Sequence, residues 1–382
     1  MAAVVACLAV PTVPALSATV PGQASTSAVA DQHVARPAVT ARVARALGRS
    51  GELRGVALND VNAQDALPLA VADFPRMQAE GINSVTVYLY LYVASPTGST
   101  VSTGPLTPSD QTLQLVSTAA AQFGLGVHYM PVLLDNATNG FRGVYQPSDV
   151  AGFFRSYTTM IDRYADLAEQ NNVSLFYVGS ENNSLAGRTA AWHALIGSVR
   201  THFHGALTYM ATGYDGYYVK FWNDLDMVSL SAYYSMGDEK TVSYSRLMNA
   251  WNGSHLPYLR KFAAAVHKPL IIGELGYMSQ TGGYSAPADS TGSHLPAPQA
   301  QADAYRAMFD AISKSGFVYG VSLWVWRTAT TDADTSFSPF GKPAECVLTQ
   351  RWSTDATALR LASLPTCNLA AVDKVTNTLP QV

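Results

Sequence analysis

The chain has 382 residues, of which 48% are hydrophobic and 13% are charged, and its net charge at pH 7 is −3. Few charges and no basic run argue against binding to nucleic acid or to an anionic membrane surface. The hydrophobic content is typical of a globular protein, and the length is sufficient for one α/β barrel of about 250 to 300 residues.

The first 18 residues are apolar and rich in Ala and Val, and small residues follow them. This pattern predicts a signal peptide over residues 1–18 and therefore a secreted, extracellular protein. Pro11 and Pro14 argue against a transmembrane helix, for which the stretch is also too short. Residues 19–50 lack a clear apolar period, so we expect a linker or disordered segment, with a short helix over 39–50 as the alternative for its last part.

From residue 53 onwards, short apolar or β-branched runs alternate with helix-like stretches. This alternation is typical of repeated βα units around a parallel sheet. Helical periodicity is clearest over residues 153–170 and 300–315, and Pro343 suits the first turn of a last helix. The predicted strands cover residues 54–60, 82–93, 126–134, 174–180, 206–212, 225–234, 268–274 and 319–326.

Eight such units predict an α/β fold, a single (β/α)8 TIM barrel over residues 51–352. The alternative is a doubly wound sheet, but the Gly-rich phosphate loop expected after its first strand is missing from the sequence. Residues 353–382 are expected to form a C-terminal tail that packs on the barrel or trails from it. Cys346 and Cys367 are expected to form a disulfide in this exported chain, and two buried free thiols are the alternative.

Two glutamates follow buried strands in a similar context. Glu181 lies in LFYVGSENNSL and Glu274 in KPLIIGELGYMS. By the strand count they end strands four and seven, and the carboxyl ends of all strands of a βα barrel meet at one mouth. A buried carboxylate is costly without a partner or a task. One such glutamate is often a helix cap or half of an ion pair, but two of them are what hydrolysis of a glycosidic bond requires.

An ordered set of motifs extends over residues 54–352: NGFRGVYQPSD (139–149), FYVGSENNSL (176–185), VKFWNDLDMVSLSAYY (219–234), PLIIGELGYMS (269–279) and SPFGKPAECVL (338–348). In these motifs the chain resembles glycoside hydrolase family 113, whose best-known members are β-mannanases. The resemblance implies a retaining TIM-barrel glycosidase with Glu181 as general acid/base and Glu274 as nucleophile. The further positions that match substrate-binding residues of the family are Phe141, Arg142, Tyr233, Trp324 and Trp326.

The chain departs from the family pattern at four places. Phe141 and Leu323 stand where the family usually has Trp, and Ser231 stands where it usually has Asp. Asn182 and Asn183 follow the acid/base, where a Leu and a small residue are common. These positions surround the sugar rather than the two carboxyl groups, so they bear on mannan specificity and leave hydrolysis intact.

The expected reaction is double displacement with retention, in which Glu274 attacks the anomeric carbon while Glu181 protonates the leaving oxygen. Such a pair needs carboxyl groups ~5 to 5.5 Å apart. We expect Glu274 to stay ionised with the help of a hydrogen bond from Tyr233. Burial and the charge of Glu274 are expected to keep Glu181 neutral.

Other side chains near the strand ends are candidates for sugar contacts. Trp324 and Trp326 lie two apart on strand eight, so we expect them to share a face and to stack on sugar rings, with barrel core as the alternative. Asn59 and Asp135 follow strands one and three and are placed either to bind sugar hydroxyls or to form turns. For Arg142, the alternative to a role in substrate binding is that it anchors a loop.

Two aromatic groups receive no functional role. Tyr88, Tyr90 and Tyr92 share one face of strand two, and we expect some of them to pack against helices. Phe221 and Trp222 precede strand six, at the end of the barrel away from the mouth, and are expected to be packing residues.

No cofactor and no metal are expected. The seven lysines all miss the strand ends, where the Schiff-base lysine of a barrel aldolase would lie. His128 is the only histidine within a predicted strand, and a metal-dependent hydrolase needs several inward ligands. The predicted partner is an oligo- or polysaccharide, most directly β-1,4-mannan or manno-oligosaccharides, and we expect a monomer. Another β-glycan, or a carbohydrate-binding barrel without catalysis, is the alternative.

Overall fold

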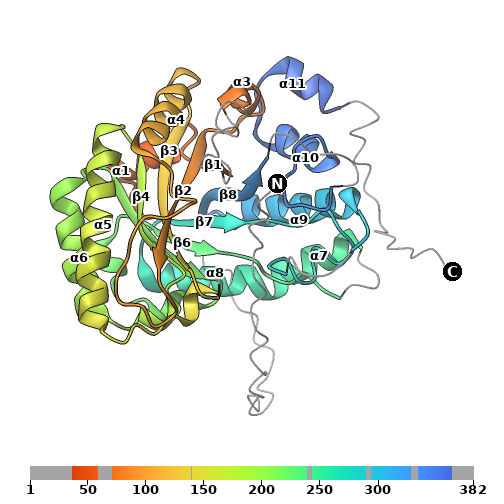
Figure 1. Cartoon of the computed structure of the whole chain (residues 1–382). Coiled ribbons are helices and arrows are strands. Elements are labelled where there is room, and N and C mark those ends of the chain that lie inside the picture. The colour runs from red at the N-terminus through yellow and green to blue at the C-terminus, as the bar shows by residue number, and fades with distance from the viewer. Residues whose placement is uncertain are drawn as a thin grey trace, which may run out of the picture.

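Eight parallel strands close into a barrel in which neighbours in the chain are neighbours in the sheet (Figure 1). The structure is a computed structural model that describes residues 37–58, 71–138, 140–238, 243–289, 294–327 and 334–363. The prediction of a (β/α)8 barrel is confirmed, and the doubly wound alternative is wrong. The strands are β1 (Leu53–Leu58), β2 (Ser84–Val93), β3 (Gly126–Asp135), β4 (Leu175–Ser180), β5 (Ala206–Thr212), β6 (Val228–Ser231), β7 (Leu270–Leu275) and β8 (Val318–Trp326).

Helices cover the outside of the barrel, as Figure 1 shows. Their starts follow ordinary capping rules: the Asp149 side chain accepts the Gly152 N–H at the start of α5, and Pro343 occupies the first turn of α10 as predicted. The helices are α1 (Ala41–Leu47), α3 (Phe74–Ala79), α4 (Asp110–Gln122), α5 (Val150–Gln170), α6 (Thr189–His202), α7 (Tyr244–Ala250), α8 (Leu256–Val266), α9 (Pro298–Ser315), α10 (Pro343–Trp352) and α11 (Ala356–Leu361).

Every predicted strand overlaps an observed strand, and the largest difference is at β6. The apolar pattern predicts residues 225–234, whereas the strand covers Val228–Ser231. Just after it the chain turns, since the Tyr234 N–H bonds to the Ala232 carbonyl at 2.7 Å. The apolar run extends beyond the residues that pair with β5 and β7, so the apolar pattern alone overestimates the length of β6.

The core has two layers, one inside the barrel and one between the strands and the helices. On β2, Val87 and Leu89 face the helices, whereas Tyr88, Tyr90 and Tyr92 lie in the inner layer. Side chains alternate between the two faces of a strand, so the three tyrosines share the inner face. The expectation that some of them pack against helices is therefore wrong, because apolar residues between them fill the outer positions.

Helix α1 contributes to the inner layer. Val43, Ala46 and Leu47 are buried there, together with Leu53 at the start of β1, and the Thr40 side chain accepts the Val43 N–H at the start of the helix. The last part of the stretch expected to be a linker is thus an ordered helix, in agreement with the alternative for residues 39–50. Its apolar face closes the end of the barrel opposite the strand tips.

Several predictions fall on residues outside the described ranges. The signal peptide over residues 1–18 is one, and the disulfide between Cys346 and Cys367 is another, because residues 364–382 are not described. Both stay predictions. In the part of the chain that the structure describes, no helix combines the length and the hydropathy that crossing a bilayer would need.

Candidate active site

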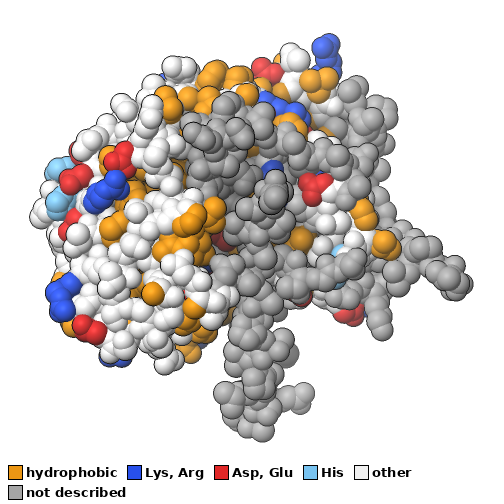
Figure 2. All heavy atoms as spheres, in the orientation of Figure 1, with side chains coloured by type: hydrophobic (Ala, Val, Ile, Leu, Met, Phe, Trp, Pro, Cys, Tyr) orange, Lys and Arg blue, Asp and Glu red, His pale blue; other side chains and the backbone are white. Residues whose placement is uncertain are grey.

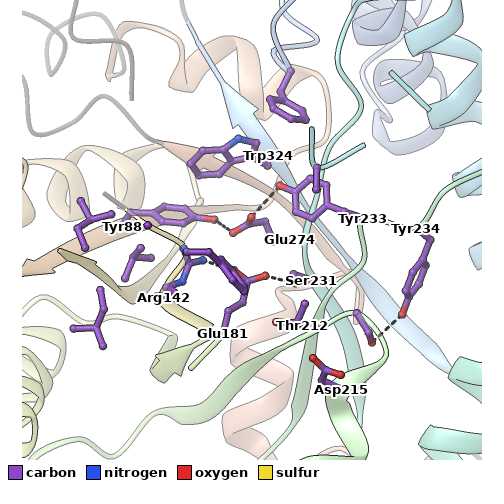
Figure 3. A pocket seen from close by; sticks show the side chains of 18 of the residues that line it. Tyr88, Arg142, Glu181, Thr212, Asp215, Ser231, Tyr233, Tyr234, Glu274 and Trp324 are labelled. Carbon is purple, nitrogen blue, oxygen red and sulfur yellow. Dashed lines mark hydrogen bonds and ion pairs between the residues drawn. The ribbon is translucent and has the colours of Figure 1, made fainter. Parts of the chain in front are cut away.

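A cavity of about 450 Å³ opens at the carboxyl ends of the strands, where barrel enzymes carry their active sites. Figure 3 shows the side chains that reach into it from β2, β5, β6, β7, β8 and the connecting loops. Of the predicted site residues, those that line this cavity are Glu181, Glu274, Tyr233, Arg142, Phe141 and Trp324. Further lining residues that the sequence did not indicate as site residues are Tyr88, Tyr90, Thr212, Tyr214, Asp215 and Phe337.

The glycine before Glu274 has a steric reason. A Cβ on Gly273 would lie 1.9 Å from the Ser229 hydroxyl oxygen of the neighbouring strand. Only a residue without a side chain therefore lets β7 approach β6 at this level. This close approach positions Glu274 on the strand tip, where it points into the cavity.

Glu181 is positioned by a turn at the end of β4. Its φ is 53°, in the left-handed region that non-glycine residues seldom adopt, and its N–H bonds to the Met210 carbonyl at 2.8 Å. The turn directs the carboxyl group into the cavity instead of continuing the strand. Backbone in such a conformation is often found at functional sites.

The carboxylate of Glu181 has two partners. Arg142 Nη2 lies 2.5 Å from its Oε2, and the Ser231 hydroxyl donates to its Oε1 (Figure 3). Arg142 also donates through Nε to the Ser180 carbonyl at 3.1 Å, so it is both a loop anchor and an ion-pair partner. The resemblance places Asp in the family at position 231. The hydroxyl found there donates a hydrogen bond to Glu181, where a second carboxylate would repel it.

The carboxylate of Glu274 accepts two hydroxyl hydrogen bonds. Tyr88 donates to Oε2 at 2.6 Å and Tyr233 donates to Oε1 at 2.9 Å. The contact from Tyr233 agrees with the expectation from the sequence, whereas Tyr88 was given no role. The alternation of side chains along β2 predicts that Tyr88, Tyr90 and Tyr92 share one face of the strand. The sequence does not indicate that this face points to the inside of the barrel, where the site lies.

Burial, followed by the negative charge of Glu181, raises the pKa of Glu274 to about 7. Arg142 and the hydroxyl groups of Tyr88 and Tyr233 act in the opposite direction on this pKa and do not offset the rise. The result differs from the expectation of a fully ionised Glu274. The reason is that the strand tip is almost completely desolvated, since Glu274 is only 7% exposed.

Aromatic rings form much of the remaining wall. Trp324 meets Tyr88 edge to face, with 4.9 Å between the ring centroids, and Phe337 lies 6.2 Å from Tyr233. Phe141 lies beside Arg142, whose Cζ is 5.9 Å from the ring centroid. A mostly apolar wall with a few convergent polar groups suits a ligand that has both apolar faces and hydroxyl groups.

The predicted contact of Trp326 with sugar is wrong. Its indole N–H donates to Asp73 at 2.8 Å and its ring packs on Phe340, in the layer outside the barrel. The expected alternation of faces along β8 fails because its pairing with β1 shifts register. Val56 pairs with Leu323 and Leu58 pairs with Trp326, so three residue steps along β8 correspond to two along β1. One extra residue reverses the face of every later side chain.

Asp135 forms a turn and Asn59 lies outside the described residues. The Asp135 carboxylate accepts the N–H groups of Thr138 and Gly140 and the hydroxyl of Tyr145. Burial would raise the pKa of Asp135, but these hydrogen bonds hold it below its usual value. The turn-forming alternative therefore applies to Asp135. The packing role expected for Phe221 and Trp222 also applies, since both are buried beside Tyr209.

The family model described as Glycoside Hydrolase Family 113 matches residues 61–342. The chain belongs to glycoside hydrolase family 113. As a member of this family it is a glycoside hydrolase, and the resemblance noted in the sequence is confirmed. Within the residues described, no group of three or more His, Cys, Asp or Glu side chains is arranged to hold a metal ion.

Solved structures of family 113 share the barrel. A GH113 β-mannanase, AaManA from Alicyclobacillus acidocaldarius in complex with ManMIm, is 27% identical, with a TM-score of 0.72 over 82% of this chain and 100% of that chain. A GH113 β-1,4-mannanase is 24% identical, with a TM-score of 0.70 over 79% of this chain and 99% of that one. Fungal β-1,4-galactanases share the fold at 14% identity and a TM-score of 0.52, over 78% of this chain and 98% of theirs. No curated protein matches the chain.

Proposed function

We propose that this family 113 chain is a retaining β-mannanase that hydrolyses β-1,4-mannan or manno-oligosaccharides with Glu181 and Glu274. The observation that carries the proposal is the position of these two carboxyl groups, which come from β4 and β7 and line one cavity at the mouth of the barrel. The sugar is supported by relatives, since the 27% identical family member is a β-mannanase. Export from the cell, as predicted from residues 1–18, fits a polymeric substrate.

In the first step, Glu274 attacks the anomeric carbon, and the bond from that carbon to the leaving oxygen breaks. Glu181 gives its proton to the leaving oxygen. The two carboxyl groups are electrostatically coupled, since the negative charge of Glu181 raises the pKa of Glu274. Tyr88 and Tyr233 hold Glu274 in place and stabilise its ionised form.

In the second step, Glu274 is an uncharged ester of the sugar and no longer repels a charge on Glu181. The ion pair with Arg142 and the hydroxyl of Ser231 then stabilise Glu181 as a carboxylate. In this form Glu181 removes a proton from water, the water oxygen bonds to the anomeric carbon, and Glu274 leaves. These contacts thus suit the carboxylate form of Glu181 that the second step needs.

The test uses purified wild type, Glu181→Ala and Glu274→Ala with mannan, glucan and xylan oligosaccharides. We expect the wild type to release reducing ends fastest from the mannan series, with the β-anomer appearing first by NMR, and each variant to lose turnover. Addition of azide should restore turnover of an activated aryl mannoside in Glu274→Ala, with an inverted product. Binding without cleavage, or retained activity in either variant, would contradict the mechanism.

A further inference from the structure

A second cavity of about 210 Å³ lies beside the first. Asp215 lines both cavities, and Asn183, Tyr209 and Tyr218 line only the second. The walls come from the turn after Glu181, from β5 and from the short 3₁₀ turn Asp215–Tyr218. The second cavity is therefore built partly by the same turn that presents Glu181.

A hydrogen-bonded chain fixes the wall between the two cavities. Thr212 donates to the Asn183 side-chain oxygen at 2.8 Å, and the Asn183 amide donates to Asp215 Oδ2 at 2.8 Å. Three segments are joined in this way: the end of β5, the turn after Glu181 and the 3₁₀ turn. Asp215 is thus held at the boundary with its carboxylate as an acceptor for donors from either side.

The charge around Asp215 favours a neutral ligand that donates hydrogen bonds. No ion pair with Asp215 is formed by the described basic residues, and the charge of nearby Glu181 is also negative. An anionic group would be repelled by both carboxylates. Hydroxyl groups donate to a carboxylate without adding charge, so a polyhydroxylated neutral compound fits this position.

Two exposed tyrosines flank Asp215. Tyr214 lines the first cavity and is 48% exposed, and Tyr218 lines the second and is 69% exposed. Exposed aromatic rings beside a polar cavity provide flat apolar surfaces, on which the C–H faces of a sugar ring can pack. Each of the two cavities thus has an exposed tyrosine ring next to Asp215, whose carboxylate both cavities share.

The position relative to Glu181 indicates which part of a substrate reaches this cavity. In the view of Figure 3, Glu181 lies between Glu274 and Asp215. The nucleophile acts on the sugar whose anomeric carbon is attacked, and the acid acts on the oxygen that leaves with the other part of the chain. Sugar units beyond Glu181, in the direction of Asp215, consequently belong to the leaving group.

We propose that the cavity between Asn183, Asp215 and Tyr218 is a subsite for a neutral sugar unit of the leaving group. This inference rests on the proposed function and adds to it a determinant of chain-length preference. Hydroxyl groups of the sugar donate to Asp215, and the ring of Tyr218 packs on its apolar face. An aryl mannoside has no sugar in its leaving group and does not use the subsite.

The experiment compares kcat/KM for manno-oligosaccharides of three to six units with kcat/KM for an aryl β-mannoside. The ratio of the two should fall roughly 3- to 10-fold in Tyr218→Ala, as the loss of one aromatic contact predicts. Tyr218→Phe keeps the ring and should keep the ratio. Reducing-end labelling with heavy-oxygen water should show that Tyr218→Ala cleaves at bonds nearer the reducing end, because the leaving group is held less firmly.

Tyr217→Ala is the matched control in the same 3₁₀ turn. Its ring packs on Tyr258 and Phe262, and it lines neither cavity. An unchanged ratio in Tyr218→Ala, or an equal fall in Tyr217→Ala, would overturn the subsite and leave the proposed function standing. A wild type that cleaves no mannoside would overturn both proposals.

Discussion

Each catalytic candidate has a different set of partners, and these partners determine its chemistry. Glu274 accepts hydrogen bonds from two tyrosine hydroxyls and has no cation in direct contact among the described residues, whereas Glu181 has an ion pair with Arg142. Hydroxyl groups weakly favour the charged form of a carboxyl group, and a guanidinium favours it strongly. Arg142 is therefore the group that most opposes the rise in the pKa of Glu274.

The pH dependence of activity tests this balance. Because the pKa of the nucleophile Glu274 is raised to about 7, this carboxyl group is protonated at lower pH, and kcat/KM should fall as the pH drops below about 7. The positive charge of Arg142 lowers this pKa, so Arg142→Gln should move the acidic limb upward by about 1 pH unit. Arg142→Lys keeps the charge and should move it less. An acidic limb that stays in place in Arg142→Gln would contradict the coupling.

Tyr88 should matter for catalysis although no role for it was predicted from the sequence. Tyr88→Phe removes one hydrogen bond to a charged carboxyl group, and the expected loss of kcat/KM is roughly 10- to 100-fold, with Tyr233→Phe in the same range. Tyr92→Phe is the control on the same strand, since its hydroxyl accepts the Leu106 N–H and does not reach a glutamate. Equal effects at Tyr88 and Tyr92 would mean that packing, not the hydrogen bond, is responsible.

At the scale of elements, two irregularities in strand pairing shape the site. The register shift between β1 and β8 moves Trp326 to the outside and leaves Trp324 in the cavity. The close approach of β6 and β7 at Gly273 presents Glu274 at the rim. Each irregularity involves one residue, and each changes which side chains reach the substrate.

Gly273→Ala tests the close approach. The added Cβ would lie 1.9 Å from the Ser229 hydroxyl oxygen, so we expect a loss of about 1–3 kcal/mol in the free energy of unfolding and a large loss of activity. Ser229→Ala in the same chain removes that oxygen and should recover much of the stability. Urea unfolding of both singles and the double variant measures the interaction.

Gly197→Ala on α6 is the matched control for the glycine substitution. Nothing lies within 4 Å of the Cβ that would be added, and the site is helical. This variant should be stabilised by about 0.5–1 kcal/mol, because alanine loses less conformational entropy in a helix. If Gly273→Ala behaved like Gly197→Ala, steric contact with Ser229 would not be the reason for the glycine.

At the scale of the whole molecule, charged side chains are unevenly distributed over the surface. Figure 2 shows a group of charged side chains and histidines at the left edge, over α5 and α6, and further charged side chains at the top and the right, while the described middle of this face is mostly uncharged and partly hydrophobic. Ion pairs on that edge include Arg163 with Asp110 and His202 with Asp166. This distribution suits a neutral glycan and gives no electrostatic attraction for a polyanion.

The buried Glu274 should also make the stability of the fold depend on pH. A carboxyl group whose pKa is raised from 4.5 to about 7 in the folded state contributes stability below pH 4.5 that is lost as the pH rises through 7. The loss is roughly 3 kcal/mol at pH 8, since one pKa unit corresponds to about 1.4 kcal/mol. Glu274→Gln cannot ionise, so its stability relative to wild type should be greater at pH 8 than at pH 5.

Chemical unfolding at the two pH values measures this difference. Glu52, whose side chain is 41% exposed and forms an ion pair with Arg54, provides the control, and Glu52→Gln should have about the same effect at both pH values. If the stability of Glu274→Gln relative to wild type does not increase between pH 5 and pH 8, then ionisation of this carboxyl group does not destabilise the folded protein. Functional groups that destabilise the fold are common in active sites, where activity and stability are in conflict.

The sequence by itself determined the barrel, the order of its strands and the placement of Glu181 and Glu274 at one mouth. These features depend on local apolar periodicity, on chain order and on the rule that parallel strands end together, and all three are readable along the chain. Tertiary structure alone decided that Tyr88 faces inward, that Trp326 faces outward and that Glu274 has a raised pKa. Each of these depends on a neighbour distant in sequence, through a register shift, a hydrogen bond or desolvation, and such neighbours are defined only when the barrel closes.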